Sequence, residues 1–105
     1  MLNFLKNILN PTGHQALTEA LNGGAYLVDV RTPAEFSAGS VKGAFNIPLD
    51  AISKHLGKFA GKKSIVVFCR SGNRSSQAKR ILDQNGINNV MDGGTWQNVQ
   101  QLLTN

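Results

Sequence analysis

The chain's single cysteine lies where an apolar run gives way to a short polar loop. Cys69 follows the apolar residues 65–68 and precedes a loop and a helix start made of Arg70, Ser71, Gly72, Asn73, Arg74 and Ser75. The thiolate is the reactive form of cysteine, and both a helix N-terminus and the charges of Arg70 and Arg74 would stabilise it. Gly72 lets the backbone curl so that successive N–H groups converge on one point. These residues indicate an anion-binding cradle around a nucleophilic sulfur.

A plainer interpretation is that Cys69 only packs at the end of a strand, because free cysteine is among the residue types most often buried. Such a packing residue would need neither flanking arginines nor a glycine turn. The composition of the loop therefore favours chemistry.

The loop must be positioned by the elements around it, and apolar runs alternate with helical patterns along the chain. Strands are predicted over 25–30, 44–49, 62–68 and 87–94, and helices over 14–21, 32–39, 50–56, 73–85 and 95–103. Such alternation predicts an α/β domain of three layers, with a mainly parallel sheet of about four or five short strands flanked by helices. Ligands bind outside the carboxyl ends of such strands, which is where Cys69 ends its strand.

Local signals set several boundaries. Thr32 is the predicted N-cap of its helix with Pro33 in the first position, and Asp50 is the predicted cap of the next helix. In the last helix three side chains are expected to face inward: Trp96, Val99 and Leu103.

Length and composition describe one globular domain. The 105 residues are 41% hydrophobic and 16% charged, which predicts a single domain over 1–105, with 1–12 as an extension or a short helix packed on it. No apolar run reaches the length of a membrane span, and the N-terminal residues lack the features of a secretion signal. A lone cysteine cannot form an internal disulfide, and together with the lack of a secretion signal this predicts the reducing cytoplasm as the location. No membrane attachment is predicted.

The net charge of +5 is spread over scattered lysines without interleaved aromatic residues, so nucleic acid is not an expected partner. His14 and His55 lack neighbours at ligand spacing, and neither a metal nor another cofactor is predicted.

Three stretches, LVDVRTPAEFSAGSVKGAFNIPL, IVVFCRSGNRSSQAKRIL and NVMDGGTWQNV, together resemble a single rhodanese-type sulfurtransferase domain from about Ala25 to Leu103. The resemblance implies that Cys69 attacks the outer sulfur of a donor such as thiosulfate and carries it as a persulfide. Residues 70–74 would form the cradle and Ser75 would close it. The expected partners are a small anionic sulfur donor and a thiol or cyanide acceptor, with a sulfur-relay protein as a further candidate.

Asp29 and Arg31 end the first predicted strand at the same edge of the sheet. Asp29 could orient the loop and Arg31 could attract the donor, although an ion pair anchoring a turn is the plainer interpretation; Glu35 is likewise interpreted as structural. Where the family commonly has Gly-His-Ile, this chain has Gly39-Ser40-Val41.

Two alternative functions stay open. A non-catalytic binding module could use the same cleft, although degenerate members of the family typically lose the cysteine. Cysteine phosphatases use a related loop, but they place five residues between cysteine and arginine, and Cys69 and Arg74 are separated by four. The shorter loop makes a smaller cradle, which suits a sulfur atom better than a tetrahedral phosphate.

Overall fold

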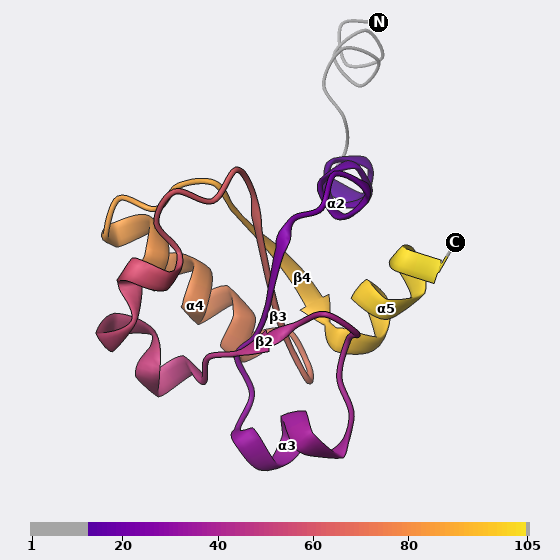
Figure 1. Ribbon diagram of the computed structural model, residues 1–105, viewed down its shortest axis with the longest axis horizontal. Coiled ribbons are helices and arrows are strands. Elements are labelled where there is room, and N and C mark those ends of the chain that lie inside the picture. The colour runs from indigo at the N-terminus through magenta and orange to yellow at the C-terminus, as the bar shows by residue number, and fades with distance from the viewer. Residues whose placement is uncertain (1–12, 105) are drawn as a thin grey trace, which may run out of the picture.

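The computed structural model describes residues 13–104, and the predicted N-terminal extension over 1–12 lies outside them (Figure 1). Its elements in chain order are α2 (Gly13–Asn22), β1 (Tyr26–Asp29), α3 (Pro33–Ala38), β2 (Phe45–Asn46), the 3₁₀ helices η1 (Leu49–Lys54) and η2 (Leu56–Lys58), β3 (Ile65–Cys69), α4 (Asn73–Gln84), β4 (Val90–Thr95) and α5 (Trp96–Thr104).

The four strands form one parallel sheet in the order β2-β1-β3-β4. Helix α4 and the 3₁₀ helices cover one face, and α2 and α5 cover the other (Figure 1). The predicted three-layer α/β fold is confirmed, with four strands. Because β3 and β1 are the inner strands, the carboxyl end of β3, where Cys69 lies, falls between its neighbours.

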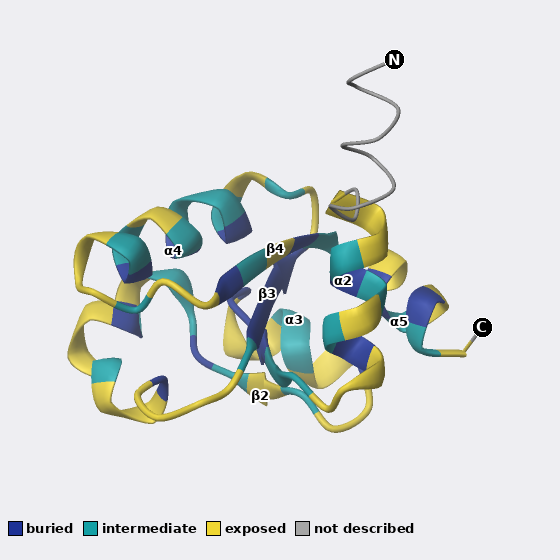
Figure 2. Ribbon diagram, turned by 90° about the horizontal axis from the view of Figure 1, so that it is seen from above, coloured by how far each residue is buried: buried dark blue, intermediate teal, exposed yellow. Residues whose placement is uncertain are grey.

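Strand β3 is the centre of the core, and all five of its residues are buried (Figure 2). Side chains of a strand alternate between the two faces of a sheet. Val67 and Cys69 accordingly pack in the cluster beneath α4, while Val66 and Phe68 pack in the cluster beneath α2 and α5. The alternation directs the Cys69 side chain to the face that carries the start of α4.

Glycine at position 93 lets α5 pack closely on the sheet. A Cβ atom there would lie 2.6 Å from Cγ2 of Val99 and 2.9 Å from Cγ1 of Val66. Both distances are shorter than carbon atoms tolerate, so this part of β4, next to the cysteine loop, requires a residue without a side chain.

Strands β3 and β4 each begin three residues later than predicted, at Ile65 and Val90. Two other predicted elements differ more. Strand β2 contains only Phe45–Asn46, and the helix predicted over 50–56 is instead a pair of 3₁₀ turns that begins after Pro48. Within it, the Ala51 and His55 N–H groups donate to the carbonyls of Pro48 and Ile52, which is 3₁₀ spacing. Ile52 is the only buried residue of these turns, so they lack the apolar stripe that supports an α-helix. The predicted cap at Asp50 is wrong, since Pro48 precedes the first turn.

The remaining helices follow the prediction closely. Thr32 caps α3 in a capping box with Glu35, and Pro33 is its first residue. In α5, Val99 and Leu102 are buried, whereas the predicted inward residues Trp96 and Leu103 are only partly buried. Within residues 13–104, no helix combines the length and the apolar composition needed to cross a membrane.

Candidate active site

The Cys69 sulfur lies inside the loop that follows it. The N–H of Gly72 donates to Sγ at 3.0 Å, and the N–H of Ser75 donates to it at 3.3 Å. The thiol itself donates to Oγ of Ser75 at 3.4 Å, and that hydroxyl donates to the Gly72 carbonyl at 3.1 Å. Two backbone N–H groups and one hydroxyl therefore surround a sulfur whose residue is fully buried.

The conformation of the loop depends on Gly72. Its φ of +94° is in the left-handed region, and it stands at the N-cap position of α4. A side chain there would strain the backbone, so glycine suits the turn that brings the two N–H groups toward the sulfur. The N–H groups of Gly72, at the N-cap, and of Ser75, in the first turn of α4, then point at an atom that can carry negative charge.

The pKa of Cys69 reflects two opposing effects. Burial raises the pKa of the thiol, whereas the hydrogen bond with the Ser75 hydroxyl, which can turn to donate once the sulfur is ionised, and hydrogen bonds from the amides of Ser75, Gly72 and Ser71 lower it. The lowering is larger, and the pKa lies below the usual value for cysteine. The loop therefore favours the thiolate, which is the nucleophile.

Arg74 makes an ion pair that the single sequence does not reveal. Its Nη1 and Nη2 donate to the two carboxylate oxygens of Glu35, at 2.7 and 3.0 Å. Together with hydrogen bonds from Thr32, this pairing lowers the pKa of Glu35 to about 2. Arg74 thus ties the first turn of α4 to α3, and its charge is shared with a carboxylate rather than directed at the sulfur alone.

The other predicted loop residues contribute differently. Arg70, Ser71 and Asn73 are exposed on the outer side of the loop. Ser75 is buried, and its N–H donates to the sulfur. The immediate surroundings of the sulfur are therefore formed by backbone N–H groups and Ser75, with the two arginines farther out.

Asp29 and Arg31 pair with each other at the carboxyl end of β1. Asp29 accepts from Nε and Nη2 of Arg31, the latter at 2.7 Å, and from the Arg31 N–H at 3.0 Å. Arg31 also donates to the Gly39 carbonyl at 2.6 Å and lies 5.3 Å from the centre of the Trp96 ring. Ser40 donates to Asp29 at 2.7 Å.

The hydrogen bonds of the Asp29 and Arg31 side chains thus stay within the segment between β1 and β2, and within residues 13–104 none reaches the cysteine loop. This geometry matches the ion pair and turn anchor of the plainer interpretation. Ser40, at the position where the family commonly has histidine, completes the shell of donors around Asp29. A short hydroxyl side chain gives little sign of that role in the sequence.

No described group of three or more His, Cys, Asp or Glu side chains is arranged to hold a metal ion.

Replacing Ser75 by alanine is expected to raise the pKa of Cys69, because it removes the strongest of the hydrogen bonds that favour the thiolate. A higher pKa means less thiolate at neutral pH, so iodoacetamide should alkylate the variant more slowly there and equally fast at high pH. Arg74→Gln should shift the profile less, since Glu35 already shares its charge. A larger shift in Arg74→Gln than in Ser75→Ala would show that the arginine dominates.

Comparison with known proteins places this geometry in a family. The sequence model of the rhodanese-like domain family matches residues 13–98 of this chain. A sulfurtransferase of Allochromatium vinosum is 38% identical over 66 residues, which cover 63% of this chain and 62% of that protein. Thiosulfate sulfurtransferase PspE of Escherichia coli is 35% identical over 69 residues, covering 64% and 66%. The chain therefore matches somewhat less than two thirds of the length of these relatives.

Solved structures of similar fold point to the same family. A rhodanese from E. coli, solved with anions, has a TM-score of 0.65 and 31% identity, covering 71% of this chain and 91% of that one. The human single-domain sulfurtransferase TSTD1 has a TM-score of 0.64 and 25% identity, covering 82% and 90%. The family model, the relatives and the shared fold agree on one conclusion: this chain belongs to the rhodanese-like domain family.

Proposed function

We propose that this chain is a sulfurtransferase that moves a sulfane sulfur from a small anionic donor to a thiophilic acceptor through a persulfide on Cys69. The observation that carries the proposal is the sulfur's position between the N–H groups of Gly72 and Ser75. That position favours the thiolate and would equally favour the anionic outer sulfur of a persulfide. Membership of the family and relatives named sulfurtransferase support the same function.

The proposed reaction has two steps. The Cys69 thiolate attacks the outer sulfur of thiosulfate; a sulfur–sulfur bond forms to Cys69, the bond to the central sulfur breaks, and sulfite leaves with the electron pair. An acceptor then attacks the outer sulfur of the persulfide. The sulfur–sulfur bond to Cys69 breaks, and its electron pair returns to Cys69 as the thiolate. When the acceptor is cyanide the product is thiocyanate, and when it is a thiolate the product is a new persulfide. No external oxidant or reductant is needed.

Surface charge suits an anionic donor. Arg70 is exposed at the outer side of the loop, and Arg74 lies in the first turn of α4. Exposed cations beside a buried nucleophile raise the local concentration of a small anion. Thiosulfate, low-molecular-weight persulfides and a protein persulfide such as that of a cysteine desulfurase all present the same outer sulfur, so all three are candidate donors.

A reducing compartment is part of this proposal, because the single cysteine must stay free to act. The cytoplasm stays the predicted location. Similar proteins include ones named mitochondrial, in Schizosaccharomyces pombe, and chloroplastic, in Arabidopsis thaliana, so the domain is found in relatives of more than one compartment.

Loading the protein with sulfur tests the proposal directly. Incubation with thiosulfate, without added reductant, should increase the intact mass by one sulfur atom, about 32 Da, and added cyanide should reverse the increase. Cys69→Ala should show no increase under the same conditions. Absence of the adduct in the unmodified chain, across thiosulfate and small persulfide donors, would count against the proposed function.

A further inference from the structure

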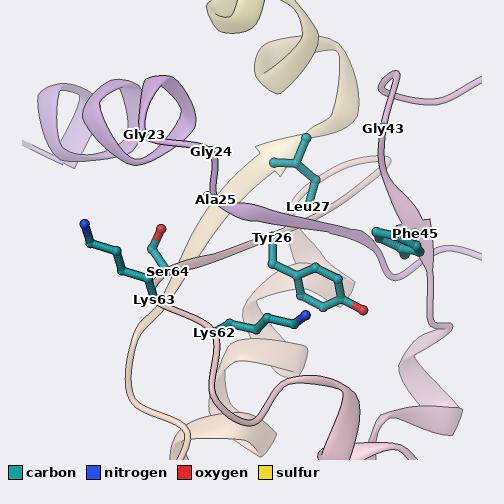
Figure 3. A pocket seen from close by; sticks show the side chains of 10 residues that line it. All are labelled: Gly23, Gly24, Ala25, Tyr26, Leu27, Gly43, Phe45, Lys62, Lys63 and Ser64. Atoms are coloured by element: carbon teal, nitrogen blue, oxygen red, sulfur yellow. The ribbon is translucent and has the colours of Figure 1, made fainter.

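A recess lies at the amino ends of the strands, whereas Cys69 lies at the carboxyl end of β3. Figure 3 shows the recess from close by. It has a volume of about 330 Å³ and is lined by residues at the amino ends of three strands, Gly43 and Phe45 at β2, Gly24 and Tyr26 at β1, and Lys62 and Lys63 before β3. The length of β3 separates this recess from the Cys69 sulfur, roughly 13 Å at the usual rise per residue. A molecule bound here would leave the sulfur site open.

An aromatic row extends from the core to this recess. Phe59 is buried, its ring lies edge-on 6.1 Å from that of Tyr26, and the Tyr26 ring lies 5.2 Å from that of Phe45. Phe45, 57% exposed, is the one large hydrophobic side chain that is exposed within residues 13–104. Because the inner rings hold the outer one, Phe45 is an ordered apolar anchor, the kind of residue that dominates the energy of protein interfaces.

The recess is also positively charged. The Lys62 ammonium lies 4.4 Å from the centre of the Tyr26 ring, which holds that cation beside the aromatic row (Figure 3). Lys62 and Lys63 both line the recess, and none of the residues that line it is an aspartate or a glutamate. Charge complementarity therefore calls for a negatively charged occupant.

The shape favours an extended occupant over a small molecule. A neighbouring recess, also of about 330 Å³, shares Gly23, Lys63 and Ser64 with the first and reaches Met91, so the two adjoin, and we call them together the groove. The only carboxylate among the residues that line the groove is Glu19, at its far end. Acidic groups of an occupant would therefore lie at the lysine end, with an apolar side chain on Phe45.

We propose that this groove is a docking surface for an acidic segment of a partner protein, a segment that places an apolar side chain on Phe45 and carboxylates beside Lys62 and Lys63. The proposal does not depend on the sulfurtransferase activity, because the two lysines precede β3, at the end opposite Cys69, and Phe45 lies on the edge strand β2, which β1 separates from β3. It predicts that a partner can stay bound while Cys69 exchanges sulfur.

A fluorescent peptide tests the proposal with the full chain. The probe is a short peptide of glutamates around a central leucine and tryptophan, and binding is followed by fluorescence anisotropy. Phe45→Ala and Lys62→Gln/Lys63→Gln should each weaken binding about tenfold, and Phe45→Leu should restore most of it. Binding should weaken as salt rises. Saturation with peptide should leave the rate of Cys69 alkylation unchanged.

A matched variant separates the groove from overall charge. Lys54→Gln/Arg80→Gln removes the same two charges from exposed positions outside the groove and should bind as the unmodified chain does. If this control weakened peptide binding equally, the effect would come from net charge alone and the proposal would be overturned. A peptide affinity that is unchanged in Phe45→Ala would overturn it as well. Binding to anionic vesicles but not to the peptide, with the same dependence on Phe45, would replace the protein partner by a membrane surface. Circular dichroism of each variant confirms that it is folded.

Discussion

A Cys69→Ser variant is expected to lose sulfur transfer from thiosulfate to cyanide by more than about a thousandfold. Serine fits the same space and can still accept the N–H groups of Gly72 and Ser75, so the cradle should survive. A serine hydroxyl is far less ionised than a thiol near neutral pH and forms no persulfide. The loss would therefore lie in the rate of the chemical step. Thiocyanate production, measured over a range of thiosulfate concentrations, gives the turnover.

Two comparisons make that result specific to sulfur chemistry. Ser75→Ala keeps the nucleophile and should retain measurable turnover, with its pH profile moved to higher pH because the pKa of Cys69 rises. Hydrolysis of an aryl phosphate should be absent from the unmodified chain and from both variants. Residual thiocyanate production by Cys69→Ser close to that of the unmodified chain would place the reaction at another group.

The fold could be predicted from the sequence because its signals are local. The apolar run 65–68 is long enough only for a strand buried on both faces, and Thr32-Pro33 starts a helix through a capping box that four neighbouring residues complete. The secondary structure of the segment after Pro48 is harder to predict. Its residues allow either helix type, and only tertiary packing around the single buried residue Ile52 decides that it forms 3₁₀ turns.

The site was predictable in part for the same reason. Cys69, Gly72 and Ser75 are neighbours in sequence, so a strand end, a left-handed turn and a helix start bring them together. The Arg74–Glu35 pair joins positions 39 residues apart, and no spacing in a single sequence encodes such a contact. The same holds for the bond from Ser40 to Asp29. Interactions between separate loops depend on how the whole sheet arranges its edge.

Those pairs change how the arginines contribute to the site. Loop composition alone suggests that Arg74 faces the sulfur with a full positive charge, whereas Glu35 takes both ends of its guanidinium. The electrostatic stabilisation of the sulfur then comes from the buried Ser75 hydroxyl and from N–H groups fixed by the start of α4, rather than from an arginine side chain. A rigid cradle of this kind would be available in every step of the proposed cycle, in which Cys69 gains and loses sulfur.

The largest effect on stability is expected from Asp29→Ala, which should lower the free energy of unfolding by about 3–5 kcal/mol. The Asp29 side chain is fully buried and that of Arg31 is 6% exposed, so removing the carboxylate leaves a buried guanidinium with its main partner gone. The Arg31 N–H and the Ser40 hydroxyl lose their acceptor as well. Urea unfolding followed by tryptophan fluorescence and circular dichroism measures the change.

Two further variants assign that loss to the unpaired charge. Ser40→Ala removes one hydrogen bond to the same carboxylate and should cost only about 1 kcal/mol. In Asp29→Ala/Arg31→Met the buried charge is gone together with its partner, so the double variant should be more stable than Asp29→Ala alone. If the double variant is instead the less stable of the two, Arg31 stabilises the turn without Asp29, through its contacts with the Gly39 carbonyl and the Trp96 ring.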